Sequence, residues 1–143
     1  MQTADFLEAI GALTAQLKAY ALKLPPIVHL AAVPTGVKPQ PESIEDYEKI
    51  VTRVRTQSAG TRYKSLGDSL IDSLEAFEGG RLLGAVQPLL AVLDHLERMQ
   101  RDKEIEVRPI DEKRIADYRT ALRRILPGNK PELDGMGGGN VKR

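Results

Sequence analysis

The sequence predicts an all-α protein in which about five helices pack as a bundle. Apolar side chains recur at alternating spacings of three and four residues, which places them along one face of a helix. The chain has 143 residues, 41% of them apolar, with two Phe, four Tyr and no Trp. This is enough for one domain with an aliphatic core. The clearest rows are Phe6, Ile10, Leu13, Leu17, Tyr20 and Leu24, and then Leu82, Val86, Leu89, Leu93 and Leu96.

The first helix is predicted over residues 5–24, with Thr3 as its N-cap. Pro25 and Pro26 end it, because proline cannot donate to the helical hydrogen-bond ladder. Residues 25–41 hold five of the nine prolines but also several apolar side chains. An extended arm that lies on a surface, either its own or a partner's, is therefore predicted there. The apolar residues expected to form its interface are Ile27, Val28, Leu30, Val33 and Val37.

Two central helices are predicted over residues 43–57 and 62–78, with a break at residues 58–61 between them. Ser43 followed by Asp46 resembles a capping box at the start of the first of these helices. The second has an apolar face that should pack against its neighbours. Its apolar residues are Tyr63, Leu66, Leu70, Leu74 and Phe77.

The fourth helix is predicted over residues 82–102. The two glycines at 79–80 leave room only for a tight turn, so this helix should form an antiparallel hairpin with the one before it. Pro88 lies inside the helix, and the residue four positions earlier is Gly84. The proline predicts a kink in the helix, and a restart of the helix at Pro88 is the alternative.

The region after the fourth helix predicts one short strand and one more helix. Residues 104–108 alternate between charged and apolar side chains, and a two-stranded ribbon with residues 27–33 is the only pairing available. The fifth helix is predicted over residues 111–126, with Asp111 as its N-cap and Pro127 after its end.

The domain organisation follows from these elements. Residues 1–126 are predicted to form a single helical domain. Residues 127–143 hold five of the twelve glycines and are predicted to be a flexible tail.

Charge is segregated along the chain, although 21 basic and 20 acidic residues nearly balance. Residues 49–64 hold five basic and no acidic side chains, and residues 65–78 hold four acidic and no basic ones. Patches of opposite sign predict an interface with a neighbouring copy, and two solvated surfaces are the alternative. The basic patch consists of Lys49, Arg53, Arg55, Arg62 and Lys64, and the acidic stripe consists of Asp68, Asp72 and Glu75.

The basic patch also suggests an anion site. Arg62 and Lys64 are predicted in the first turn of a helix, where the helix dipole disfavours cations. Backbone N–H groups near Gly60 would add donors for a phosphate or carboxylate, so an anion site is one hypothesis and a solvated surface the other. The acidic stripe is not expected to bind a metal, because no second carboxylate helix or histidine accompanies it.

The sequence offers little support for a third hypothesis, a small enzyme or metal protein. There is no cysteine, and His29 and His95 stand alone, without a recognisable catalytic or nucleotide-binding motif. No catalytic residue, cofactor or small-molecule substrate is therefore expected. No apolar run reaches 18 residues, and Asp5 and Glu8 interrupt the N-terminal segment, so no membrane span or signal peptide is expected. The cytoplasm, or a particle assembled there, is the expected location.

Two functions are consistent with this sequence. The first is a non-enzymatic structural or adaptor subunit that works through protein–protein contacts in a homo-oligomer or larger assembly, such as a viral particle. The alternative is a nucleic-acid-binding accessory protein that uses the basic patch and the fifth helix. The net charge of +1 and the lack of interleaved aromatic residues disfavour this alternative. The basic residues of that helix are Lys113, Arg114, Arg119, Arg123 and Arg124.

Overall fold

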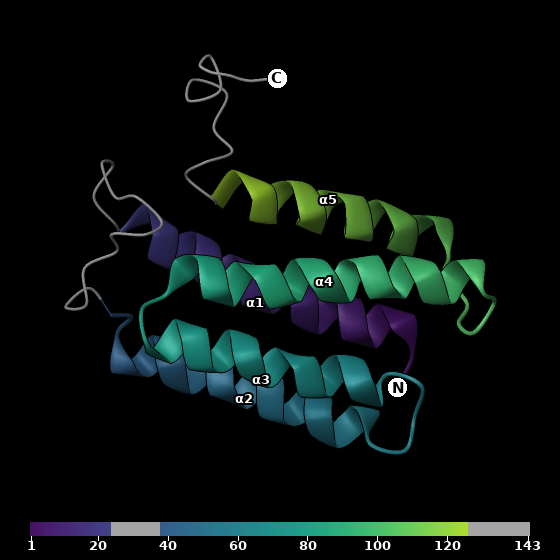
Figure 1. Ribbon diagram of the computed structural model, residues 1–143, viewed down its shortest axis with the longest axis horizontal. Helices are drawn as coiled ribbons and strands as arrows, with labels where there is room; N and C mark the ends of the chain where they lie inside the picture. The colour runs from purple at the N-terminus through teal and green to yellow at the C-terminus, as the bar shows by residue number, and fades with distance from the viewer. Residues whose placement is uncertain (24–37, 126–143) are drawn as a thin grey trace, which may run out of the picture.

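The computed structural model describes residues 1–23 and 38–125, and five α-helices form most of this part of the chain (Figure 1). Within these ranges no strand occurs and the helices pack as a bundle, so the all-α prediction is confirmed. The predicted arm residues from Ile27 to Val37 and the predicted tail, 127–143, lie outside the described residues. The helices are α1 (Thr3–Leu22), α2 (Pro41–Ser58), α3 (Lys64–Glu78), α4 (Leu82–Arg101) and α5 (Pro109–Ile125).

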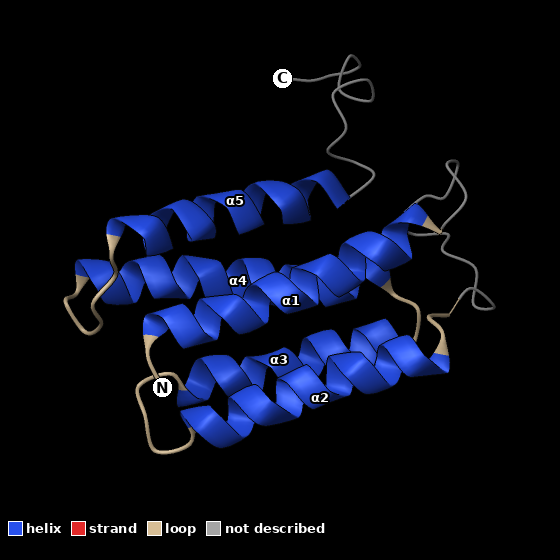
Figure 2. Ribbon diagram, turned by 180° about the vertical axis from the view of Figure 1, so that it is seen from behind, coloured by secondary structure: helices blue, strands red, loops and turns tan. Residues whose placement is uncertain are grey.

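The helices form three layers. α1 and α4 lie in the middle layer, α2 and α3 lie on one side of it, and α5 lies on the other (Figures 1 and 2). Consecutive helices run in opposite directions, so α1, α3 and α5 all begin at the same end of the bundle. The most extensive packing joins α3 to α4, α2 to α3, and α1 to α5. Short connections make α2 and α3, and α3 and α4, antiparallel neighbours, whereas α1 and α5, the first and last helices, run in the same direction.

The apolar rows predicted from the sequence form the core. Those on α1 and α4 are buried almost completely, apart from Leu24, which lies outside the described residues. A chain of hydroxyl groups crosses this core between α2, α3 and α4. Ser73 Oγ donates to the carbonyl oxygen of Ala85 at 2.7 Å, and the Tyr47 hydroxyl lies 2.5 Å from Ser73 Oγ. Because the Ser73 proton is used on Ala85, Tyr47 must be the donor of the second bond.

Three helices begin two residues earlier than predicted. α1 starts at Thr3 with Gln2 as its N-cap, whereas α2 and α5 start at Pro41 and Pro109. Proline suits the first helical position, because its fixed φ is helical and no N–H is needed there. The capping box expected at Ser43 is therefore wrong, since that residue lies inside α2.

The two predicted N-caps, Thr3 and Asp111, lie inside their helices instead. The Thr3 hydroxyl donates to the Glu106 carbonyl oxygen at 2.9 Å, outside its own helix. Asp111 is the third residue of α5, and its carboxylate accepts the backbone N–H of Arg108 at 3.2 Å. Asp5 on α1 accepts the Gln2 N–H in the same way, at 3.0 Å. An aspartate at the third helical position therefore secures the start of both helices.

α4 runs through Pro88 as one continuous helix, so the alternative of a restart at that residue is wrong. The proline leaves the Gly84 carbonyl without its usual helical donor. Gly84 has a second role that was not predicted from the sequence. A Cβ at this position would lie 3.0 Å from Cβ of Ala76, so the missing side chain lets α4 approach α3 closely.

The strand predicted over residues 104–108 is wrong. These residues form an irregular connection between α4 and α5, and their backbone groups are bonded to helix ends instead of a neighbouring strand. The Glu104 N–H donates to the Met99 carbonyl oxygen at 2.8 Å, and the Glu106 carbonyl oxygen accepts from Thr3. The proposed partner strand, residues 27–33, lies outside the described residues.

Candidate functional site

The α2–α3 hairpin carries both charged patches of the sequence. At its turn end, Asp68 binds two cations at once. Arg55 Nε lies 3.4 Å from Asp68 Oδ1, and Lys64 Nζ lies 2.8 Å from Asp68 Oδ2. The hydrogen bond from Lys64, with a smaller contribution from Arg55, lowers the pKa of the Asp68 carboxyl below its ordinary value. Asp68 was predicted as part of the acidic stripe, but the fold places it within the basic patch.

The remaining members of the basic patch differ in their surroundings. Lys49 pairs with Glu45 on the same helix at 3.3 Å. Arg53 and Arg62 are exposed, and neither forms an ion pair with another described residue. Five basic residues thus share the turn half of the hairpin, residues 49–71, with one acid, Asp68.

The predicted anion site has fewer donors than expected. Arg62 lies in the turn before α3 and not in its first helical turn. The Thr61 N–H already donates to the Ser58 carbonyl oxygen at 2.9 Å, and the Tyr63 N–H donates to Thr61 Oγ1 at 3.1 Å. Lys64 is engaged with Asp68. Anion binding at this turn stays a prediction.

The open end of the hairpin is acidic on both helices. The Arg55–Asp68 contact fixes the register between α2 and α3. Glu48 lies seven residues, or about two turns, before Arg55 on α2, and Glu75 lies seven residues after Asp68 on α3. The two glutamates therefore share the same groove of the hairpin. Residues 41–48 of α2 and residues 72–78 of α3 contain seven exposed acids and no basic residue. They are Glu42, Glu45, Asp46 and Glu48 on α2, and Asp72, Glu75 and Glu78 on α3.

The charges on α3 oppose the dipole of their own helix. The first residue of α3 is Lys64, although the N-terminus of a helix favours anions. Its last turn contains Glu75 and Glu78, although the C-terminus favours cations. Asp68 compensates Lys64, but among the described residues no cation forms an ion pair with either glutamate. Each such placement at an exposed helix end costs roughly 0.3–1 kcal/mol.

The four acids on α2 were not predicted as part of the charged surface. They lie before the basic patch, whereas the acidic stripe was identified only after it. A signal was present, because an antiparallel α2–α3 pair brings the beginning of α2 beside the end of α3. The acidic half of the hairpin is therefore larger than the predicted stripe of Asp68, Asp72 and Glu75. It includes the last two of these residues but not the first.

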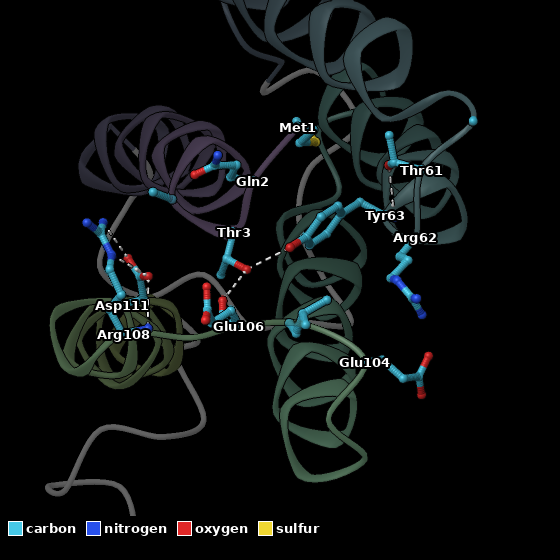
Figure 3. A pocket seen from close by; sticks show the side chains of 13 residues that line it. Met1, Gln2, Thr3, Thr61, Arg62, Tyr63, Glu104, Glu106, Arg108 and Asp111 are labelled. Atoms are coloured by element: carbon cyan, nitrogen blue, oxygen red, sulfur yellow. Dashed lines mark hydrogen bonds and ion pairs between the residues drawn. The ribbon is translucent and has the colours of Figure 1, made fainter.

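An open hollow of about 610 Å³ lies at the end of the bundle where α1, α3 and α5 begin (Figure 3). The Thr3 hydroxyl lies 2.6 Å from the Tyr63 hydroxyl and bonds to the Glu106 carbonyl oxygen. Asp111, only 2% exposed, binds the backbone and guanidinium groups of Arg108. The buried polar side chains of this hollow are thus bonded to neighbouring groups of the chain. These bonds tie the α4–α5 connection to the start of α1 and to the α2–α3 turn.

Two of the five basic residues on α5 are occupied by ion pairs. Arg119 binds Asp94 at 2.8 Å and Glu97 at 2.6 Å on α4, and the bond to Glu97 is the main cause of a raised pKa for its guanidinium. Lys113 pairs with Asp117 at 2.9 Å. This leaves Arg114, Arg123 and Arg124 as the members of the predicted nucleic-acid surface on α5 that have no ion pair to a described residue.

The described ranges, 1–23 and 38–125, contain no group of three His, Cys, Asp or Glu residues placed to hold a metal ion. No helix in these ranges is both long and apolar enough to cross a bilayer. Comparison with known proteins finds no match, since no family model, curated protein or solved structure is significantly similar to this chain. The function must therefore be inferred from the residues and their geometry.

Proposed function

We propose that this protein is a non-enzymatic structural or adaptor subunit that works through protein–protein contacts in a homo-oligomer or larger assembly. One observation supports the proposal. The α2–α3 hairpin carries seven acids and no base at its open end, and five bases with one acid at its turn end. In addition, Glu75 and Glu78 occupy the helix end that disfavours them.

This arrangement is unfavourable in an isolated chain and favourable beside a cationic surface. Like charges on the same groove repel, and the helix dipole adds to the repulsion at the end of α3. A partner that presents arginines or lysines would relieve both effects. Departures from the local rules of helix design are expected at functional surfaces, because the compensation comes from the partner.

A second copy of the chain can supply the cations. If two hairpins pack side by side in opposite directions, each acidic end faces the basic end of the other copy. The contact is then isologous and closes as a dimer. The two cations without an ion pair to a described residue, Arg53 and Arg62, are the residues that we expect to bind the acidic end. Such complementary patches also orient the two copies during encounter.

The experiment compares the mass of the protein in solution at low and high salt. The test variant carries Glu75→Lys and Glu78→Lys. The control carries Glu112→Lys and Asp117→Lys on α5, which changes the net charge equally in the layer opposite α2 and α3. The wild type and the control should exceed the mass of one chain at low salt and lose mass as salt screens the contact. The test variant should lose the salt-dependent part of this association.

The thermal stability of the same variants separates lost association from misfolding. Lysines at the end of α3 suit the helix dipole, so the monomeric test variant should melt at a higher temperature than the wild-type monomer. A monomeric wild type at all concentrations tested, or equal association by the wild type and the test variant, would overturn the proposal. A test variant that loses association and also melts earlier would contradict the role given to the helix dipole.

A further inference from the structure

α5 is the last described helix and occupies the outer layer of the bundle alone (Figure 2). It has four buried residues, as α2 does, whereas α1 has nine. Its buried apolar residues, Ile115, Leu122 and Ile125, belong to the hydrophobic core, and two further contacts position the helix. The Tyr118 ring packs against Gly11 on α1, and Arg119 forms ion pairs with two carboxylates on α4. α5 therefore docks as an amphipathic helix on the surface formed by α1 and α4.

The connection from α4 to α5 contains a strained residue. Lys103 has φ of 59°, in the left-handed region where a side chain is disfavoured. α3 and α4 end in the same way, with a backbone bond from an N–H beyond the helix end to a carbonyl five positions earlier. In α3 this bond joins Arg81 to Ala76, and the left-handed residue is Gly80, with φ of 71°. In α4 a lysine occupies the equivalent position.

We infer that α5 is exchangeable between two copies of the chain. In the exchanged dimer, α5 of each copy occupies the α1–α4 surface of the other. Residues 102–105 act as the hinge, and the backbone at Lys103 leaves the left-handed region. Every contact of α5 beyond the hinge is available in both forms, so the balance depends on hinge strain and on protein concentration. Short strained hinges favour such exchange.

The exchange rests on the proposed function, in which a second copy is the partner, and it adds α5 as an element shared between the two copies. It uses a different surface from the α2–α3 hairpin. The ion pairs of Arg119 allow exchange of α5 to be tested separately from association through the α2–α3 hairpin. These pairs join α5 to α4, so they form between two copies only if α5 is exchanged.

The experiment places opposite charge reversals in two chains. The first chain carries Arg119→Glu, and the second carries Asp94→Arg and Glu97→Arg. Within either chain, α5 and α4 then repel each other. In an exchanged heterodimer, position 119 of the first chain, now negative, faces positions 94 and 97 of the second chain, which are now positive. The native Arg119 of the second chain meets the native carboxylates of the first. The two chains are co-expressed, and native mass spectrometry measures the composition of the product.

A 1:1 heterodimer is expected, with a melting temperature above that of either chain alone. A chain that carries all three substitutions provides the matched control. It restores attraction within one copy, so it should behave as the wild type and show that the substitutions are tolerated. If the co-expressed chains remain monomers or form only homodimers, and the three-substitution control folds normally, the inference is wrong.

The hinge gives a second, independent measurement. Lys103→Gly removes the strain of the closed form, so it should lower the dimer fraction of refolded protein at least several-fold at the same concentration. An unchanged or higher dimer fraction would contradict the role of the hinge. Glu75→Lys and Glu78→Lys, added to both chains of the heterodimer, should not reduce its yield. Loss of heterodimer in that background would assign the association to the α2–α3 hairpin and not to α5.

Discussion

The ring of Tyr118 on α5 lies directly over the backbone of Gly11 on α1. A Cβ at residue 11 would lie 2.5 Å from the phenolic oxygen and 2.8 Å from the ring carbon that bears it, closer than atoms of a packed side chain approach one another. A larger residue at position 11 would therefore have to displace the Tyr118 ring. The contact is one of those that hold α5 against the middle layer of the bundle.

Gly11→Ala should displace Tyr118 and lower the free energy of unfolding by about 1–3 kcal/mol, as overpacked sites do. Urea unfolding of four proteins measures this effect. They are the wild type, Gly11→Ala, Tyr118→Ala and the double variant. With the ring absent, the added methyl group has space, so the double variant should be more stable than the sum of the single effects implies. Simple additivity would show that the two residues do not interact.

The hydrogen bond between the Tyr47 and Ser73 hydroxyl groups should contribute substantially to the free energy of unfolding. Ser73→Ala leaves the Tyr47 hydroxyl buried without an acceptor, which should cost about 1–3 kcal/mol. Adding Tyr47→Phe removes the stranded hydroxyl. The double variant should therefore recover part of the loss in a denaturant titration. If the double variant were less stable than Ser73→Ala alone, the hydroxyl could not be the cause.

The buried Tyr47 also predicts instability at alkaline pH. Burial raises the pKa of its hydroxyl well above the ordinary value of 10.0, although the bond with Ser73 opposes the shift. Folding therefore favours the neutral side chain. The full contribution is present below about pH 10, and it is lost as higher pH ionises this tyrosine in the unfolded chain. The free energy of unfolding of the wild type should fall above pH 10, and Tyr47→Phe should show a shallower fall. Equal slopes would contradict this assignment.

Asp111 should contribute to stability at neutral pH and lose that contribution in acid. Burial alone would raise the pKa of its carboxyl, but hydrogen bonds and charge attraction from Arg108 outweigh burial and lower it below 3.8. The ionised form is thus favoured by folding, and its contribution disappears as pH falls through the lowered pKa. Asp111→Asn should cost about 1.5–3 kcal/mol at pH 7 and much less near pH 2.

Asp5 provides the matched control for that experiment. It accepts the N–H of its own N-cap residue as Asp111 does, but it is exposed on α1. Asp5→Asn should therefore cost only about 0.5–1 kcal/mol at pH 7. Unfolding curves of both variants at the two pH values give the comparison. A loss for Asp111→Asn that persists unchanged at pH 2 would rule out the electrostatic explanation.

The left-handed residues should respond to substitution in opposite directions. Lys103→Gly relieves a disfavoured conformation and should stabilise the monomer by about 1 kcal/mol. Gly60→Ala introduces the same strain and should destabilise it by about 1 kcal/mol. No atom lies within 4 Å of the added Cβ, so strain alone is measured. Melting temperatures at low protein concentration test both. A destabilised Lys103→Gly would show that the lysine side chain matters more than the backbone.

The helices could be predicted from the sequence because their apolar rows were long and regular. Their starts were less accurate for a physical reason. Thr3 and Asp111 are residue types that favour the N-cap, but each serves another partner, and Pro109 occupies the first position of α5. The alternation at 104–108 resembled a strand, yet its backbone groups bond to the end of α4 and the start of α1. Such tertiary bonds have no local sequence signal.

The charged surface could be predicted only in part. Segregation along the chain identified the basic patch and three acids, because those residues are contiguous in sequence. Two features depend on the register of α2 against α3. One is the position of Asp68 among the cations, and the other is the groove of the hairpin that Glu48 and Glu75 share. That register is a tertiary property. The ion pairs of Arg119, which link residues 22 and 25 positions apart, could not be inferred for the same reason.

Rows of similar aliphatic side chains do not by themselves fix how two packed helices align along their length. If α3 slid by one turn along α4, leucines would still face leucines, and the buried apolar area would change little. The hydroxyl of Ser73 would then lose the carbonyl of Ala85, and Tyr47 would lose Ser73. The small polar chain in the middle of the bundle therefore penalises slipped alignments that the leucines tolerate. It selects one structure from several that would bury nearly the same surface.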